Sequence, residues 1–382
     1  MSKAVWIAVA AACIIGLADA RAQEKQGWVK ISHNLTESVE GYDDSVPGAR
    51  GIGGLVVDRH TGDVLMGLNG PPFGLYRSGD AGRTWERIDG GNVVGGWVRS
   101  HSIQLDQDKP GRIAAFRVGP PAPEDGPKSA VTLDGGQSWR PIADAWAFHG
   151  LSGWVYGMVD WSREPLHVMA QNRVRPDLQL STDGGQNFKK LSGNIEGIVE
   201  LTWNHQYMRA RQTKGWEWFK EQHVHGFGAC EGAVLLGRYD GGIDRSTDGG
   251  ESYERVSDFT VSAPTPIRFD GRLYWGAEKG VIVSEDAGKT WALSGSELPM
   301  VRKGPFFGAD AADMVVVAES GVYRTSDAGR TWNKVCDLFK PERAWRADRG
   351  PAWLRTDYAW DHTRNIVYVA GMAGPAYKLE VE

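Results

Sequence analysis

Cysteine is scarce in this chain, which has three cysteines among 382 residues. Cys13 lies in an apolar N-terminal segment, so Cys230 and Cys336 are the two that remain for the rest of the chain. Two cysteines form at most one bridge, which excludes a fold built on disulfides. Neither one has neighbours at the spacing that metal ligands require. We therefore expect two buried free thiols, no bound metal and no cofactor.

Long hydrophobic runs are also lacking. The apolar stretch Ala4–Ala18 is about 15 residues long, short of the roughly 20 that a membrane-spanning helix needs. Lys3 precedes it, and small residues with A-x-A-type spacing follow it up to Ala22. This pattern predicts a secretory signal peptide over residues 1–22 and a secreted or periplasmic protein without a stable membrane span. An uncleaved membrane anchor is the alternative.

The chain has no excess of positive charge. Its formal net charge is −5 and its isoelectric point is near 6.0, which argues against nucleic acid as a partner. Two residue types are abundant instead: 50 glycines and 17 tryptophans. Many tight turns with one packing aromatic per unit would produce this composition, which therefore indicates internal repeats.

Six segments fit the pattern S/T-x-D-x-G-x-T/S-W, with Asn and Phe or Tyr replacing the last two letters in places. Their acidic positions are Asp80, Asp134, Asp183, Asp248, Asp286 and Asp327. The Asp and Ser/Thr side chains can accept hydrogen bonds from backbone amides across a tight turn, and the glycine supplies a positive φ. The aromatic residue begins the next strand and can fill the space between neighbouring sheets.

The repeated motif resembles the Asp box, or BNR repeat, of the sialidase-like β-propellers. The resemblance recurs across nearly the whole chain beyond residue 22. It implies a propeller in which these turns lie at the periphery of the blades, away from the face that binds ligand. We therefore expect the six carboxylates to be structural and assign none of them to catalysis.

The blade count follows from what lies outside the six motifs. The last two Asp-to-Asp spacings are 38 and 41 residues, which suits four-stranded blades of about 40 residues. Three further strands are predicted near 353–360, 366–370 and 376–379, and Gly27–Ser32 resembles the strand that follows a motif. These features predict an all-β, seven-bladed propeller over residues 23–382, with the seventh blade closed by strands from both chain ends. Six blades with a separate C-terminal hairpin are the alternative.

Candidate site residues come from the loops that enter each innermost strand and from the loops between second and third strands. His101 directly precedes the predicted strand Ser102–Leu105 and should emerge near the axis, where it could act as a general acid or base. A histidine bonded to backbone at a strand end is the alternative. The candidate catalytic residues are His101, Tyr156 and His225. The candidates for substrate binding are Arg99, Arg173, Arg175, Tyr207, Arg209, Trp216, Arg302 and Arg355.

One insertion, residues 194–225, explains the spacing of 65 between Asp183 and Asp248. It is rich in aromatic and basic residues, which can stack on sugar rings and bind carboxylates. The insertion could be a lid over a sugar site, or its aromatics could only pack the loop onto the propeller. His223 and His225 alternate on a predicted strand, but the sequence indicates no third metal ligand.

These features predict a carbohydrate-active enzyme, a glycoside hydrolase or polysaccharide lyase, whose partner is an anionic, uronate-containing glycan or oligosaccharide. Hydrolysis requires two carboxylates or a Tyr/Glu pair, whereas a lyase requires a base such as His or Tyr with Arg to neutralise the substrate carboxylate. The F/Y-R-I-P motif of true sialidases is absent, so we do not expect standard sialidase activity. The alternative is a non-catalytic platform that binds protein or glycan. In either case we expect a monomer.

Overall fold

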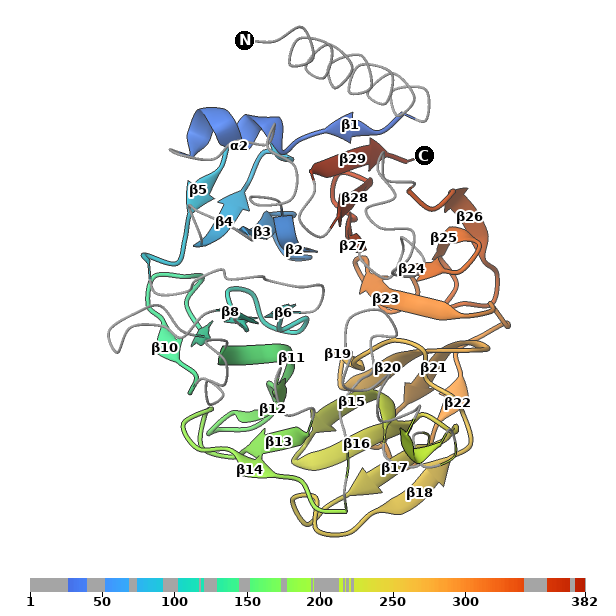
Figure 1. Ribbon diagram of the computed structural model, residues 1–382. Helices are drawn as coiled ribbons and strands as arrows, with labels where there is room; N and C mark the ends of the chain where they lie inside the picture. Colours follow the sequence, from blue (N-terminus) through green and yellow to red (C-terminus); the bar gives the residue numbers. More distant parts are fainter. Residues whose placement is uncertain are drawn as a thin grey trace, which may run out of the picture.

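The computed structural model shows seven small antiparallel sheets arranged in a ring (Figure 1). The structure describes residues 27–39, 52–68, 74–91, 102–116, 118–119, 129–143, 152–172, 177–193, 195, 213–215, 217, 220, 223–339, 356–371 and 375–381. Each sheet is one blade, with its first strand nearest the centre of the ring. The protein is therefore the all-β, seven-bladed propeller that the sequence predicted.

The first three blades follow one another along the chain, with one strand, β8, exchanged between the second and the third. The first blade contains β2 (Ile52–Val57), β3 (Val64–Leu68), β4 (Gly74–Ser78) and β5 (Glu86–Arg87). The second contains β6 (Ile103–Leu105), β7 (Ile113–Ala115), β9 (Ala130–Thr132) and β10 (Arg140–Pro141). The third contains β11 (Ser152–Asp160), β12 (His167–Asn172), β13 (Leu178–Ser181) and β14 (Lys189–Lys190), and β8 (Val118–Gly119) pairs with the start of β11.

The remaining blades follow the same plan. The fourth contains β15 (Val224–Cys230), β16 (Ala233–Arg238), β17 (Ile243–Ser246) and β18 (Glu254–Ser257). The fifth contains β19 (Ile267–Phe269), β20 (Arg272–Ala277), β21 (Gly280–Ser284) and β22 (Ala292–Leu293). The sixth contains β23 (Val301–Phe307), β24 (Met314–Ala318), β25 (Gly321–Thr325) and β26 (Asn333–Cys336). The seventh contains β27 (Thr356–Asp361), β28 (Ile366–Gly371), β29 (Ala376–Glu380) and β1 (Val29–Lys30).

Both ends of the chain close the ring in the seventh blade. The N-terminal strand β1 lies antiparallel beside the C-terminal strand β29, with Val29 opposite Lys378 (Figure 1). This confirms the predicted closure, and the six-bladed alternative is wrong. A short helix that the sequence did not predict, α2 (His33–Ser38), follows β1 and buries Leu35. None of the helices among the described residues is long and apolar enough to cross a membrane.

The hydrophobic core lies between the faces of neighbouring blades. At the junction of the seventh and first blades, the buried side chains include Ile31, Leu68, Trp85 and Tyr368. Similar buried clusters separate other neighbouring sheets. Cys230 is a buried free thiol as predicted, whereas the free thiol of Cys336 is only half-buried.

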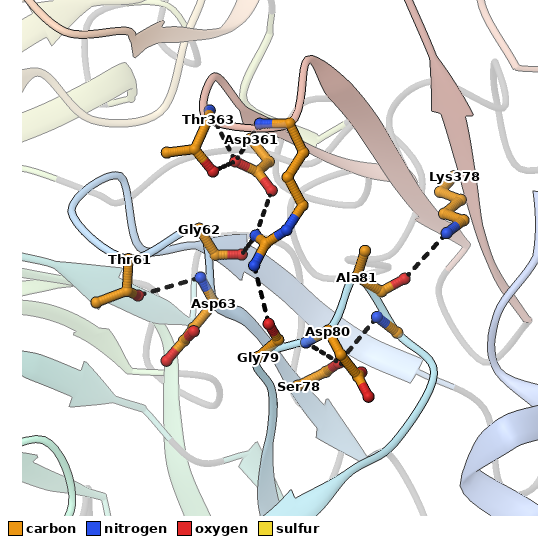
Figure 2. Close-up of polar contacts among 12 residues, drawn as sticks. Thr61, Gly62, Asp63, Ser78, Gly79, Asp80, Ala81, Asp361, Thr363 and Lys378 are labelled. Atoms are coloured by element: carbon orange, nitrogen blue, oxygen red, sulfur yellow. Dashed lines mark hydrogen bonds and ion pairs between the residues drawn. The ribbon is translucent and has the colours of Figure 1, made fainter.

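The six turn motifs share one hydrogen-bond pattern. In the first, the Ser78 hydroxyl donates to Asp80 Oδ1 (2.8 Å) and accepts from the Gly82 N–H (2.8 Å) (Figure 2). Asp80 also accepts from the backbone N–H and the hydroxyl of Thr84, at 2.9 and 2.7 Å. Equivalent bonds recur at Asp134, Asp183, Asp248, Asp286 and Asp327. The hydrogen bonds that each of these carboxylates accepts therefore hold a turn.

Each motif also packs against the preceding blade. Trp139 of the second motif donates its indole N–H to the carbonyl of Ile88, which directly follows the last strand of the first blade (3.0 Å). Gly136 approaches the same residue so closely that a Cβ there would lie 2.8 Å from the Ile88 carbonyl oxygen. The glycine is therefore required both for its φ of 95° and for the close approach between blades.

Candidate functional site

The two faces of the propeller carry different features. We call the face where the innermost strands begin the upper face, and the face where they end the lower face. The turn motifs follow the third strand of the first six blades, and antiparallel strands alternate in direction, so the motifs lie on the lower face. This geometry separates the six motif carboxylates from the upper face.

On the upper face, β-bulges interrupt several innermost strands at the same position. In β15, Val224 pairs with Arg238 and Gly226 with Gly237, which leaves His225 as the extra residue. Arg302 is the extra residue of β23 in the same way. The corresponding residues of the first and third blades are Gly53 and Val155. Bulges of this kind redirect a side chain and occur often beside active sites.

The fifth blade, which lies between His225 and Arg302 in the ring, has the same irregularity at Ser262. The backbone N–H groups of Ser262 and Ala263 both donate to the carbonyl of Gly276, at 2.9 and 3.1 Å. The Ser262 hydroxyl donates to the carbonyl of Val301, the residue before Arg302 (2.7 Å). Three consecutive blades therefore place His225, Ser262 and Arg302 at equivalent positions.

An aromatic residue supports His225. The imidazole of His225 stacks on the ring of Tyr239, with centroids 4.4 Å apart and an interplanar angle of 18°. Tyr239 follows β16, and its backbone N–H donates to the carbonyl of His223 (3.1 Å). This stack fixes the plane of the imidazole from one side.

The electrostatics of the site keep His225 neutral. Burial, and secondly the positive charge of Arg302, lower the pKa of His225 from 6.5 to about 4. Burial likewise lowers the pKa of Arg302, while the carboxylates of Glu319 and Glu278 oppose that shift. At neutral pH the site therefore presents an uncharged imidazole and a guanidinium cation whose charge acts on it, a combination that can accept a proton and bind a carboxylate.

The segment before Arg302 is held in an unusual conformation. Met300 has a φ of 58°. The other described non-glycine residues with a positive φ lie in turn motifs or in the connections between first and second strands, whereas Met300 lies in neither. Its backbone N–H donates to the carbonyl of Glu278 (2.8 Å). A left-handed conformation at such a residue costs free energy, so the surrounding contacts must enforce it. These contacts position the start of β23 and with it Arg302.

Three of the predicted site residues lie in the part of the chain that the structure describes. The charge of Arg302 acts on the imidazole of His225, although the two residues are 77 positions apart in the numbering. Tyr156 is 3% exposed and packs with Val224 and Phe227 between the third and fourth blades, so its contacts are those of a core residue and its catalytic role stays a prediction. Eight predicted residues fall outside the described residues: His101, Arg99, Arg173, Arg175, Tyr207, Arg209, Trp216 and Arg355.

The predicted insertion 194–225 also falls largely outside the described residues. Its last residues, 223–225, lead into β15, and there the two histidines differ. His223 is buried, whereas His225 is partly exposed and is displaced by the bulge. Among the described residues, no group of three or more His, Cys, Asp or Glu side chains could hold a metal ion.

Sequence reasoning missed Tyr239, Ser262 and the bulges. The residues at the bulge positions are Gly53, Val155, His225, Ser262 and Arg302, which share no residue type. A bulge depends on how two strands pair, so no local sequence signal could have revealed this alignment.

No protein-family model and no curated protein sequence matches the chain. Among solved structures, YCF48 bound to a D1 peptide is similar at 15% identity over 93% of this chain and 97% of that chain, with a TM-score of 0.43. YCF48 from Cyanidioschyzon merolae is similar at 11% identity over 93% and 98%, with a TM-score of 0.43. The GH74 enzyme of Niastella koreensis is similar at 12% identity over 87% and 60%, with a TM-score of 0.44. These proteins are β-propellers, and the likeness concerns the fold alone.

Proposed function

We propose that this protein is a carbohydrate-active propeller that cleaves an acidic, uronate-containing glycan by β-elimination. The observation that carries the proposal is the placement of His225 and Arg302 at equivalent bulges of the upper face, where the charge of Arg302 acts on a neutral imidazole. A guanidinium pairs well with the carboxylate of a uronic acid, and a neutral imidazole can take a proton from the adjacent carbon. This proposal selects the lyase from the two reactions that the sequence left open.

In the proposed reaction, Arg302 binds the uronate carboxylate and stabilises the negative charge that develops on it when the C5 proton leaves. His225 accepts that proton, and the electron pair of the C–H bond forms the C4–C5 double bond. The bond between C4 and the glycosidic oxygen breaks, and the departing oxygen takes a proton. Tyr239, stacked on His225, carries a hydroxyl that can supply this proton. The products are an unsaturated uronate and a new sugar hydroxyl.

The described carboxylates fit hydrolysis less well. Glu278 and Glu319 are both exposed, and both act electrostatically on Arg302. A hydrolase needs two carboxyl groups on either side of the scissile bond, one of them protonated in apolar surroundings. Exposed positions do not supply such surroundings, so β-elimination is the better match to this site.

One observation favours a second candidate function, a non-catalytic binding platform. Arg302 and the two exposed carboxylates that act on it, Glu278 and Glu319, together carry charges of both signs. A charge-mixed upper face suits recognition of a protein or glycan without chemistry. The same face would then bind its partner through Arg302, and the partner would leave unchanged.

We further propose that residues 1–22 direct export, so that the protein acts as a monomer in the periplasm or outside the cell on an anionic glycan. Mass spectrometry of the protein recovered from its producing cells tests the export signal. An N-terminus after Ala20 or Ala22 supports it, and a retained Met1 contradicts it.

The activity is tested by incubating the exported protein with a panel of uronate-containing polysaccharides and following ultraviolet absorbance and reducing ends together. Absorbance from an unsaturated product supports a lyase, whereas reducing ends without absorbance support a hydrolase. His225→Ala should abolish the absorbance, while the lower-face variant Arg330→Ala should retain it. Binding without product formation across the panel would favour the platform, and full activity of His225→Ala would refute the assigned base.

A further inference from the structure

The central channel of the propeller is closed at the lower face. Arg59, in the connection from β2 to β3, crosses from the first blade to the sixth. Its guanidinium donates to the carbonyls of Gly308 (2.9 Å) and Ala309 (3.0 Å). It also donates to the carbonyl of Gln107 in the second blade (3.2 Å) and lies over the ring of Phe269, 4.5 Å from its centroid. One side chain therefore links four blades beneath the channel.

A second contact crosses the ring beside Arg59. Asp108 of the second blade forms an ion pair with Arg268 of the fifth, and its other carboxylate oxygen accepts from the Asp270 N–H (2.7 Å). Phe269 stacks on Phe307 of the sixth blade, with centroids 4.3 Å apart. We call Arg59, Asp108, Arg268, Phe269 and Phe307 the lower clasp. These contacts cross the lower end of the channel, so the channel is a pocket that opens towards the upper face.

Several backbone groups that line the channel are already hydrogen-bonded by side chains from neighbouring blades. The innermost strands have one open edge, which would otherwise make the channel wall polar. The amide of Gln104 accepts from the Val159 N–H (3.1 Å) and donates to the Gly157 carbonyl, so it replaces a neighbouring strand for β11. Such contacts leave apolar side chains as the main surface of the channel.

The charged groups at the channel wall are also paired. The Lys303 ammonium and the Asp357 carboxylate form a buried ion pair at 3.2 Å, and the second oxygen of Asp357 accepts from the Leu55 N–H (3.2 Å). The pair joins the sixth, seventh and first blades. A ligand in the channel would thus meet no unsatisfied charge from Lys303 or Asp357.

The channel contains a cavity of about 160 Å³, lined mainly by apolar residues that include Val56, Leu105, Met158, Ile267, Phe306 and Trp360. An apolar cavity of roughly 150 Å³ in another protein is known to bind benzene. We propose that this pocket is a binding site for a compact, uncharged apolar ring of about the size of benzene, entering from the upper face. The site is independent of the proposed lyase activity, because neither His225 nor Arg302 lines it.

The test uses toluene as the probe and saturation-transfer NMR on the full chain. Thr265 lines the pocket from the fifth blade and belongs to no hydrophobic core cluster of the described residues. Thr265→Trp should fill the pocket and lower toluene affinity at least tenfold, whereas the similarly shaped Thr265→Val should bind toluene as well as the natural protein. Val56→Phe fills the pocket from the opposite side of the ring and should act like Thr265→Trp.

Cooperative thermal unfolding of each variant establishes that it folds. The proposal is overturned if the natural protein shows no saturation transfer to toluene, or if both filling variants bind it unchanged. A crystal structure with a chain of ordered waters in the pocket in the presence of toluene would also overturn it. None of these outcomes depends on glycan cleavage, so the failure of this proposal and the failure of the lyase assignment are distinguishable.

Discussion

His225 and Arg302 are both the extra residue of a β-bulge at the same point of an innermost strand, two blades apart in the ring. The bulges leave the two side chains close enough for the Arg302 charge to act on the imidazole. A regular strand would have alternated its side chains without this displacement. Two local irregularities of strand pairing therefore create the candidate site.

The titration of His225 provides a direct test of this relationship. Its pKa is lowered to about 4, so the neutral form is favoured in the folded protein. Because the unfolded chain binds this proton more readily, the contribution of His225 to the free energy of unfolding is fully present above the ordinary pKa of 6.5 and is lost as pH falls towards 4. NMR of the imidazole Hε1 signal should show a midpoint below 5. Arg302→Gln should raise this midpoint, but not as far as 6.5, because burial lowers the pKa more than the Arg302 charge does. The control variant Arg330→Gln should leave the midpoint unchanged. A natural midpoint at or above 6.5 would contradict the structure.

If the lyase assignment holds, the pH profiles of kcat/KM and kcat should differ. The acid limb of kcat/KM reports the free enzyme, in which Arg302 lowers the pKa of His225. A bound uronate would neutralise part of the Arg302 charge, so the pKa rises in the complex and the acid limb of kcat moves to higher pH. Coincident limbs would indicate that the carboxylate does not bind at Arg302. His225→Ala should lower kcat/KM by about 10²- to 10⁴-fold.

The turn-motif carboxylates should stabilise the fold in a pH-dependent way. Hydrogen bonds from the Thr331 backbone, then from the Thr325 and Thr331 hydroxyls, lower the pKa of Asp327 to about 2. Its unfolded value is about 3.9, so the stabilisation is present above that pH and is lost between about 4 and 2. Asp327→Asn should lower Tm by about 2 °C at pH 7, and the difference should shrink at about pH 3. Calorimetry of both proteins at the two pH values measures this difference in Tm. The same difference at both pH values would argue against a stabilising role of the ionised carboxylate.

Two adjacent glycines in the second motif allow the cost of backbone strain to be measured apart from the cost of a steric clash. Gly135 and Gly136 have φ values of 73° and 95°, so alanine is strained at either position. A Cβ at Gly135 would contact nothing within 4 Å, whereas at Gly136 it would lie 2.8 Å from the Ile88 carbonyl oxygen. Gly135→Ala should therefore cost about 1–2 kcal/mol, and Gly136→Ala clearly more. Urea unfolding measures both, and equal losses would refute the proposed contact between blades.

The repeats made most of the fold predictable. Their spacing and the strands outside them predicted seven blades, and β28 and β29 form where strands were predicted near 366–370 and 376–379. These strands alternate regularly between tight turns, so local sequence determines them. The helix α2 was not predicted, because its six residues carry too little periodicity to be recognised.

The sequence by itself determined the class of fold, the position of the turns and the exclusion of their carboxylates from the site. It also selected His225 and Arg302 as separate candidates from their residue types. Only the tertiary structure decided that these two side chains act on each other, that Tyr239 stacks on one of them, and that Arg59 closes the channel. Bulges, ring closure and contacts across the axis depend on pairing between residues far apart in the chain. Local sequence patterns therefore do not predict them.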